Sequence, residues 1–366
     1  MRLFSVLVPV LLALGMTAPA VHAHPTDLGD TLTRVVTDGD LAGAVAATRD
    51  GPALSRLAAG HSDVETGAGF APDTHVRAGS ISKTLVAATI LQLVDENRVD
   101  LDAPIERYLP GRVRGAGIDA DAISVRQLLR HQSGLPEYFD DETPIPVEPA
   151  TADQLLDMAL VRSALFPPGT EMRYTNTNYV VAGLLIEAVT GASAADEVTR
   201  RVIAPLGLAD TYYPGPGDTG LRVPFAHGYE TDDGRRIDVT AFNASAAGLA
   251  GSLVSTNEDT SKFITALLDG RVVSPPQLAQ MMDTVEYPDN GPGFRYGLGL
   301  ASIDLPCAVR VWGHGGDIDG YHSLMVSPVV GPALSITFTQ GGSSESADDD
   351  PRTAVADAFY LSLIHI

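Results

Sequence analysis

A serine, a lysine and a long apolar run stand together in the first third of the sequence. Ser80 and Lys83 precede residues 85–94, in which only Thr89 and Gln92 are polar. A helix that is apolar nearly all round is buried in a core rather than laid on a surface. The run therefore predicts a central helix over residues 80–97, around which the rest of the chain has to fold.

The spacing of Ser80 and Lys83 adds chemistry to this helix. Residues three apart lie one turn from each other on the same face, so the hydroxyl and the amine are expected side by side. Burial disfavours the charged ammonium group and lowers the pKa of Lys83, which suits a base that activates a serine nucleophile. Lys83 and Lys262 are the only lysines, and the other 22 of the 24 basic residues are arginines. The alternative is an ordinary helix start with Ser80 near the N-cap.

A second polar motif, Arg173-Tyr174-Thr175-Asn176, comes just before a predicted helix over residues 179–190. In an extended segment, Tyr174 and Asn176 point to the same side. A phenol there could relay a proton, and an amide could orient a substrate carbonyl or the lysine. Turns rich in Asn and Thr are also common before helices, so the motif alone is compatible with a structural turn.

A third motif, Trp312-Gly313-His314-Gly315-Gly316-Asp317, lies at the end of a predicted strand. Glycines let another backbone approach a strand edge closely, and an exposed N–H at that point can form half of an oxyanion hole. His314 taken alone is also typical of a hydrogen-bonded structural histidine.

The order of the predicted elements indicates an α+β fold. Apolar runs over residues 42–48 and 53–59 predict a hairpin, and residues 309–312, 321–327 and 333–340 are predicted as strands. We expect one sheet built from about residues 24–75 and 250–360, with a helical part over about residues 76–249 inserted in the middle. The acidic, proline-rich loop over residues 136–149 is expected at the surface. Ser255-Thr256-Asn257-Glu258 resembles a capping box.

The first 23 residues predict a secretory signal. Arg2 supplies a positive start, residues 3–14 are apolar, and Val21-His22-Ala23 matches the small-residue pattern of a cleavage site. The apolar stretch is short for a membrane span, and an uncleaved anchor is the alternative. We therefore expect a secreted, extracellular protein that is cut near Ala23. The net charge of −22 argues against binding to nucleic acid or to anionic lipid.

The single cysteine, Cys307, is unusual in an exported protein, where thiols normally pair. Residues 361–366 look like a translated adapter of the kind used to prepare sequencing libraries. Our hypothesis is that this non-native tail interrupts a helix that begins near Pro351, and that a cysteine partner was lost with it. A buried free thiol is the alternative.

Taken together, Ser80-x-x-Lys83, Tyr174-x-Asn176 and His314-x-Gly316 resemble, in that order, the three motifs of penicillin-recognising serine enzymes. The Tyr-x-Asn and His-x-Gly forms are similar to those of class C β-lactamases and secreted D-alanyl-D-alanine carboxypeptidases. The resemblance extends over nearly the whole mature chain, residues 24–360. It implies a β-lactamase/transpeptidase-like α+β fold, in which an antiparallel sheet is flanked by helices and carries an inserted all-helical region.

The resemblance also implies the roles of the catalytic residues. Ser80 attacks a carbonyl and becomes acylated, while Lys83 and Tyr174 share the proton transfer, either of them as the base. Asn176 orients the substrate. Water then releases the acyl group, so that neither a metal nor a cofactor is required.

The third motif has supporting roles by the same resemblance. The backbone N–H groups of Ser80 and Asp317 form the oxyanion hole, and Gly315 and Gly316 lie where the substrate docks. His314 supports the Tyr174 hydroxyl electrostatically or by a hydrogen bond.

The chain departs from the resemblance in carboxylate recognition. Family members that cleave D-Ala-D-Ala usually have a threonine at the position of Gly315, where its hydroxyl helps hold the terminal carboxylate. Residues 301–306 also lack an arginine that could clamp that group. Arg295 or Arg310 could substitute, while Asp317 adds a like charge beside the site.

The sequence therefore predicts a secreted serine hydrolase that works through an acyl-enzyme on Ser80, first of all a D-alanyl-D-alanine carboxypeptidase acting on peptidoglycan-type peptides. An esterase, a D-amino-acid amidase or a β-lactamase on the same scaffold is the alternative. A non-catalytic penicillin-binding or cell-wall-binding module is a third possibility. β-Lactams are expected as acylating ligands, nucleic acid is not expected as a partner, and a monomer is expected. An α/β-hydrolase is disfavoured because the sequence has no Gly-x-Ser-x-Gly.

Overall fold

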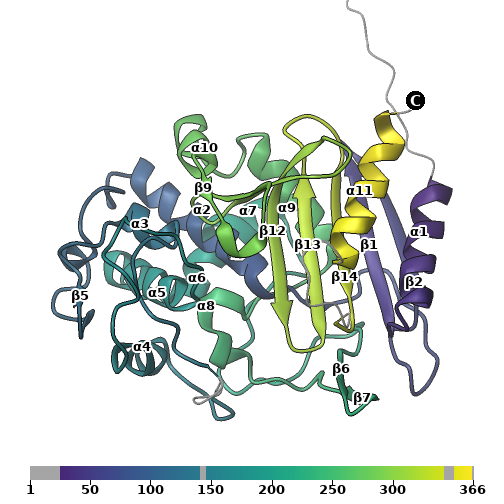
Figure 1. Cartoon of the computed structure of the whole chain (residues 1–366), viewed down its shortest axis with the longest axis horizontal. Helices are drawn as coiled ribbons and strands as arrows, with labels where there is room; N and C mark the ends of the chain where they lie inside the picture. Colours follow the sequence, from purple (N-terminus) through teal and green to yellow (C-terminus); the bar gives the residue numbers. More distant parts are fainter. Residues whose placement is uncertain (1–24, 141–145, 342–349, 365–366) are drawn as a thin grey trace, which may run out of the picture.

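The computed structural model describes residues 25–140, 146–341 and 350–364. The predicted signal sequence over residues 1–23 lies outside the described residues. Part of the predicted surface loop and the last two residues of the predicted tail lie outside them too. Figure 1 shows a sheet with its covering helices at one side of the molecule and a helical region at the other.

The main sheet has eight antiparallel strands in the order β2-β1-β14-β13-β12-β11-β10-β9. It joins the two ends of the chain, because β1 pairs with β14 and places Ala44 opposite Phe338. Its strands are β1 (Gly43–Asp50), β2 (Ala53–Gly60), β9 (Val285–Glu286), β10 (Phe294–Tyr296), β11 (Ala301–Asp304), β12 (Arg310–Ile318), β13 (Tyr321–Ser327) and β14 (Ala333–Phe338).

The segment between β2 and β9 contains the helices α2 to α10 and three small two-stranded sheets. These pair β3 (Val76–Arg77) with β8 (Val254–Ser255), β4 (Arg114–Gly115) with β5 (Ile118–Asp119), and β6 (Tyr229–Asp232) with β7 (Arg235–Asp238).

The α-helices are distributed over the whole described chain. They are α1 (Pro25–Asp38), α2 (Ser82–Asp95), α3 (Val125–Leu129), α4 (Ala152–Leu160), α5 (Thr177–Thr190), α6 (Ala194–Val198), α7 (Ala204–Leu206), α8 (Gly248–Gly251), α9 (Asn257–Leu268), α10 (Pro275–Met282) and α11 (Pro351–Ile364). Single turns lie between them: η1 (Gly79–Ile81), η2 (Ile105–Arg107), η3 (Thr199–Ile203), η4 (Ala244–Ala247) and η5 (Pro288–Asn290).

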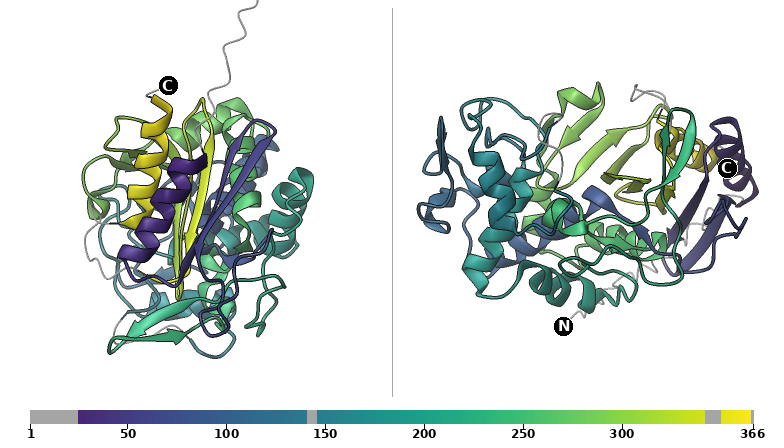
Figure 2. Two further views of the ribbon diagram at one scale, coloured as in Figure 1. Left: turned by 90° about the vertical axis from the view of Figure 1, so that its right-hand side faces the viewer. Right: turned by 90° about the horizontal axis from the view of Figure 1, so that it is seen from below.

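Helices cover both faces of the main sheet. α1 and α11 lie side by side on one face (Figure 2), where Leu32 and Phe359 share a core with Ile336 of β14. α9 lies on the other face, where Thr260 bonds to Ser335, the neighbour of Ile336 in β14. Neighbouring residues of a strand point to opposite faces, so all six residues of β14 are buried. The predicted antiparallel sheet flanked by helices is confirmed.

The predicted central helix is α2. Leu85, Val86, Ile90 and Leu91 are each at most 1% exposed, and they belong to the largest apolar cluster of the described chain. The turn η1 precedes α2, so that Ser80 stands at the entrance of a buried helix. This position holds the side chains of the first motif against a rigid core.

The helix after residue 255 begins one residue later than the predicted capping box requires. Thr256 is the N-cap, and its hydroxyl accepts a hydrogen bond from the Asp259 N–H at 3.2 Å. Ser255 cannot serve, because it lies in β8 and its hydroxyl is 2.8 Å from the Thr211 hydroxyl.

The loop over residues 136–149 lies at the surface only in part. Asp140 and residues 147–149 are exposed, as the composition predicted, but the start of the loop is not. Pro136 and Tyr138 are buried. The Tyr138 hydroxyl donates to the carbonyl oxygen of Ala246 at 2.8 Å. This tie holds the start of the loop inside the molecule.

Cys307 is a free, partly buried thiol that contacts the C-terminal helix. Its N–H donates to Oδ1 of Asp357 in α11 at 2.6 Å. The predicted start of this helix near Pro351 agrees with α11. The idea that a cysteine partner was lost stays a prediction.

Among the described helices, none is by itself long and apolar enough to cross a membrane. By length and composition only, Thr177–Thr190 and Ala194–Leu206 pass together as a pair bent by 81°. The first ten residues of α5 are buried in the protein core.

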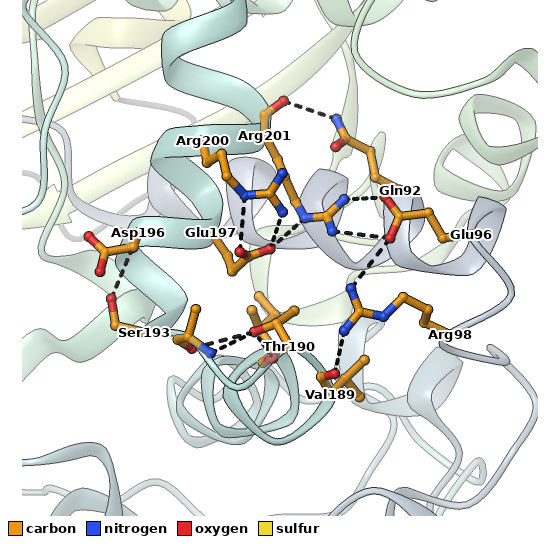
Figure 3. Close-up of polar contacts among 12 residues, drawn as sticks. Gln92, Glu96, Arg98, Val189, Thr190, Ser193, Asp196, Glu197, Arg200 and Arg201 are labelled. Carbon is orange, nitrogen blue, oxygen red and sulfur yellow. Dashed lines mark hydrogen bonds and ion pairs between the residues drawn. The ribbon is translucent and has the colours of Figure 1, made fainter.

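Glu197 of α6 belongs to an ion-pair network that reaches the residue after α2 through Arg201 (Figure 3). Its carboxylate accepts from Arg200 at 2.8 Å and from Arg201 at 2.6 Å, and Arg201 also pairs with Glu96. The Glu197 and Arg201 side chains are only 7% and 6% exposed. Removing one partner from a buried ion pair leaves the other charge poorly compensated.

Glu197→Gln is therefore expected to lower the free energy of unfolding by about 2 kcal/mol, measured by urea denaturation. Asp196→Asn, at an exposed neighbouring position, is the control and should change little. Hydrogen bonds from Arg200 hold the pKa of Glu197 below its usual value. The stability that Glu197 contributes is thus present above its unfolded pKa and is lost as the pH falls through the folded pKa. A gap between the two proteins that stays constant down to strongly acidic pH would contradict this assignment.

Candidate active site

The side chains of the first two motifs meet around the amine of Lys83. Its Nζ lies 2.8 Å from Ser80 Oγ, 2.7 Å from Asn176 Oδ1 and 2.9 Å from the carbonyl oxygen of Ala250. The Lys83 side chain is completely buried. Four parts of the chain, η1, α2, the start of α5 and α8, thus converge on one amine.

Burial controls the protonation of Lys83. It lowers the pKa to about 7, although the negative charges of Glu137 and Asp317 oppose the decrease. Near neutral pH, a large fraction of the amine is therefore uncharged. A neutral amine has two N–H donors and one lone pair, and two of its three partners, the oxygens of Asn176 and Ala250, can only accept. The lone pair is then left for the Ser80 hydroxyl, which is the arrangement of a base and its nucleophile.

Tyr174 lies over the same amine but differs from Lys83 in its protonation. The Lys83 Nζ is 4.7 Å from the centre of the Tyr174 ring. Burial raises the pKa of Tyr174 well above 10, while the nearby Ser80 hydroxyl opposes part of the rise. The Tyr174 hydroxyl makes no hydrogen bond to a described residue. At neutral pH it is a protonated phenol beside Ser80, which is suited to donating a proton rather than to taking one.

His314 does not support the Tyr174 hydroxyl in either of the two predicted ways. Its Nδ1 contacts the carbonyl oxygen of Gly315, which can only accept, so Nε2 is the nitrogen that accepts from the Tyr296 hydroxyl at 2.9 Å. Burial, together with Lys83, lowers the pKa of His314 to about 4. The ring is therefore neutral, and its centre is 6.1 Å from that of Tyr174. Tyr296, which no motif contains, is the polar partner of His314 in place of Tyr174.

Tyr174 also packs against a histidine that none of the three sequence motifs contains. The rings of His131 and Tyr174 are stacked with their centres 4.2 Å apart. The His131 Nδ1 accepts from the Thr175 N–H at 3.2 Å, which ties the second motif to the segment that follows α3. Asn176 itself is in a helical conformation, not the extended one assumed for the motif. Tyr174 and Asn176 nevertheless line the same cavity.

Glycines let the third motif pack closely against η1, the turn that carries Ser80. A Cβ atom on Gly79, whose φ is +53°, would lie 2.9 Å from the Asp317 nitrogen. A Cβ atom on Gly316 would lie 2.0 Å from the carbonyl oxygen of Ala78. Only glycine fits at such contacts. This approach places the backbone of Asp317 beside the turn that carries Ser80, where the predicted oxyanion hole requires it.

Two cavities open on Ser80, and both are also lined by Asn176 and Asp317. The first, of about 340 Å³, has a wall of Tyr287, Phe294 and Tyr296, and we call it the aromatic cavity. The second, of about 280 Å³, contains Glu230 and Asp319, and we call it the acidic cavity. A substrate whose carbonyl lies at Ser80 can therefore extend to either side.

No group of three or more His, Cys, Asp or Glu side chains that could hold a metal ion occurs among residues 25–140, 146–341 and 350–364. The groups that meet at Ser80 are suited to covalent catalysis by a hydroxyl, assisted by an amine and a phenol.

Comparison with known proteins agrees with this geometry. The family model described as Beta-lactamase matches residues 29–358. The chain belongs to the β-lactamase family. Together with the penicillin-binding proteins and esterases among its relatives, this makes it a serine hydrolase of the β-lactamase and penicillin-binding type.

Two solved structures of family members are similar over most of the chain. A D-stereospecific amidohydrolase from Streptomyces sp. is 37% identical, with a TM-score of 0.80 over 87% of this chain and 94% of that one. The D-amino acid amidase from Ochrobactrum anthropi SV3, solved with L-phenylalanine amide, is 29% identical. Its TM-score is 0.82 over 93% of this chain and 98% of that one.

A curated relative carries a penicillin-binding name. Penicillin-binding protein 4* of Bacillus subtilis (strain 168) is 25% identical over 78% of this chain. The chain spans 64% of the length of that relative.

The two arginines that the sequence offered as carboxylate clamps in this β-lactamase-family chain lie elsewhere. Arg295 donates to the Thr284 hydroxyl at 3.0 Å, and Arg310 pairs with Asp304 at 2.6 Å. Neither lines the cavities at Ser80. Both side chains instead line a separate hollow beside β10 and β11.

Arg352, which sequence reasoning missed, does line the aromatic cavity. It lies in the first turn of α11. In the sequence it is only a basic residue after Pro351, with no motif around it. Its Nη1 lies 2.7 Å from Asp317 Oδ1, and its Nε and Nη2 bond to the Asp350 carboxylate. Asp317 Oδ1 also contacts His322 Nδ1 at 2.9 Å. The guanidinium group is therefore already paired with two carboxylates.

Proposed function

We propose that this β-lactamase-family hydrolase cleaves amides and esters of D-amino acids that carry a free amino group. The observation that carries the proposal is the charge balance beside Ser80. Among the described residues that line the two cavities, Arg352 is the only arginine or lysine, and Asp317 and Asp350 neutralise it. The Asp317 side chain remains 58% exposed, and its Oδ2 makes no hydrogen bond to the described residues.

This balance favours an amine over a carboxylate on the substrate. A terminal carboxylate would approach Asp317, Asp319 and Glu230 with no unpaired cation to receive it, and like charges repel. A protonated amino group would gain from the same carboxylates. The wall of Tyr287, Phe294 and Tyr296 suits an apolar or aromatic side chain of the amino acid. The name of the Ochrobactrum relative, a D-amino acid amidase, supports D-amino-acid derivatives as the class, and that of the Streptomyces relative supports a D-stereospecific amide hydrolysis.

The reaction that we propose follows from the bonds of Lys83. The neutral amine takes the proton of the Ser80 hydroxyl as Oγ attacks the substrate carbonyl, and the N–H groups of Ser80 and Asp317 receive the oxyanion. The leaving amine or alcohol departs with a proton, for which Tyr174 and the Lys83 ammonium are the donors at hand. Water then attacks the ester on Ser80 and loses a proton to the base. A carboxylic acid is released, and the Ser80 hydroxyl is restored.

D-alanyl-D-alanine carboxypeptidase is the second candidate, and Arg352 favours it. A guanidinium group in the aromatic cavity could exchange Asp317 for the terminal carboxylate of a peptidoglycan-type peptide. The penicillin-binding relative supports the same reading, in which β-lactams acylate Ser80. For either candidate, we also propose export by a signal sequence over residues 1–23 and a monomeric state, as expected from the sequence.

Substrate selection tests the proposal. Purified protein is assayed with D-phenylalanine amide, its N-acetyl derivative and an N-blocked D-Ala-D-Ala peptide. We expect the free amine to be favoured over the acetylated amide by about ten-fold or more in kcat/KM, which is about 1.4 kcal/mol. Release of D-alanine without turnover of either amide would contradict the proposal and support the second candidate.

Asp317→Asn is expected to reduce the preference for the free amine by about ten-fold, because it removes the unpaired carboxylate oxygen while leaving the backbone N–H in place. Arg352→Met is the matched variant. It removes the cation that competes for Asp317 and should increase the preference for the free amine. The ratio of kcat/KM for the free and acetylated amides is measured for all three proteins. If both variants kept the wild-type ratio, Asp317 would have no part in selection.

A further inference from the structure

Glu137 lies directly behind the second motif, in the loop that composition had predicted to be at the surface. Its Oε2 accepts from the backbone N–H of Asn176 at 2.7 Å and from Asn176 Nδ2 at 3.0 Å. Its Oε1 accepts from the Tyr138 N–H at 2.9 Å. Glu137 lines neither cavity at Ser80, so its contacts are with the protein rather than with a substrate.

These bonds decide which way the Asn176 amide points. An ionised carboxylate can only accept, so the NH₂ group of Asn176 must face Glu137. The amide oxygen is then turned toward Lys83, whose Nζ is 2.7 Å away. An amide held from one side only could rotate and present its NH₂ group to the amine instead.

The orientation of Asn176 in turn decides what Lys83 can do. With an acceptor at Asn176 and another at Ala250, the neutral amine uses both of its N–H bonds and keeps its lone pair for Ser80. A rotated Asn176 would donate to the same lone pair and compete with the Ser80 hydroxyl. We propose that Glu137 is a positioning residue for proton transfer from Ser80 to Lys83, acting through the amide of Asn176.

The charge of Glu137 acts on the same amine. Of the carboxylates that raise the pKa of Lys83 against the effect of burial, Glu137 is the stronger and Asp317 the weaker. The other titratable groups that face Lys83 are neutral at pH 7, and these are His131, His314, Tyr174 and Tyr179. Removing the charge of Glu137 should therefore lower the pKa of Lys83 further. The pH at which the base becomes available would move down.

The test is Glu137→Gln, assayed by the burst of nitrophenol when the protein is acylated by a nitrophenyl ester. The amide side chain of this variant has one acceptor oxygen in place of the two that receive the N–H groups of Asn176 and Tyr138. It cannot satisfy both sides and therefore holds the orientation of Asn176 less firmly. We expect acylation to slow by about ten-fold or more at pH 8. We also expect the acid limb of the pH profile to move to lower pH. Glu137→Asp keeps the charge and both carboxylate oxygens, and it should recover part of the rate and the original limb.

A control variant and two outcomes decide whether Glu137 positions Asn176. Glu171→Gln, which removes an exposed glutamate in the neighbouring segment, is the control. Acylation of Glu137→Gln at the rate and pH profile of this control would refute a positioning role. A slower rate with an unchanged acid limb and a lowered melting temperature would reduce Glu137 to a structural residue. The inference rests on acyl transfer by Ser80 and not on the amide substrate, so failure to cleave D-amino-acid amides leaves it testable with the ester.

Discussion

Ser80→Ala is expected to reduce ester and amide turnover by roughly 10⁴-fold or more, because the variant has no oxygen to carry the acyl group. Mass spectrometry after incubation with a penicillin or a nitrophenyl ester should find one acyl adduct on the wild-type protein, on the peptide that contains Ser80. The variant should carry none. An adduct on any other side chain, or turnover that survives the substitution, would contradict the assignment of Ser80 as the nucleophile.

The neighbouring serine provides a matched control. Ser82 is completely buried, and its Oγ donates to the carbonyl oxygen of Leu249 at 2.6 Å and lies 3.0 Å from the Tyr213 hydroxyl. It therefore has the same chemistry as Ser80 without access to either cavity. Ser82→Ala should keep the acyl adduct and lower stability by about 1 kcal/mol. The pair of variants separates loss of the nucleophile from a general disturbance of η1 and α2.

The parts of the fold that could be predicted from the sequence are those with a strong local pattern. The apolar run of α2 allows only a buried helix. Because the helix is buried, the pKa of Lys83 is low. The hairpin of β1 and β2, the strands β13 and β14 and the start of β12 were predictable from short apolar runs between turn residues. The rest of β12 was not, because it continues through the glycine-rich third motif to Ile318. In each predictable case, the residues that decide the structure are neighbours in the sequence.

The parts that could not be predicted depend on contacts between distant segments. Composition placed Glu137 at the surface, yet the Asn176 N–H groups and the core contact of Tyr138 hold it inside. Arg352 reaches the site only because α11 lies on the sheet beside β13, where its Nη1 also donates to the carbonyl oxygen of Ser323. The partner of His314 proved to be Tyr296 on another strand, because strand order and not sequence distance selects it.

Lys83 should make the activity of the wild-type protein depend on pH through the neutral range. Because burial lowers the pKa of Lys83 to about 7, the amine is protonated and unable to accept a proton below that pH. The rate of acylation should therefore rise as the pH increases through about 7 and level off above it. If Tyr174 were the base instead, its pKa well above 10 would make the rate of acylation rise up to strongly alkaline pH. The position of the acid limb thus distinguishes the two candidate bases.

Lys83→Met is expected to slow acylation by about 10³-fold and to abolish the acid limb near pH 7, since methionine cannot take a proton. Lys83→Arg should be equally slow, because a guanidinium group stays protonated, which shows that the lone pair and not the charge is required. The control is Lys262→Met at the only other lysine, whose Nζ donates to the carbonyl oxygen of Gly207 away from the site. Lys262→Met should keep the wild-type rate and pH profile. If Lys83→Met kept a fast, pH-dependent burst, the proton of Ser80 would have to go to Tyr174, and the buried amine would be a structural cation despite its low pKa.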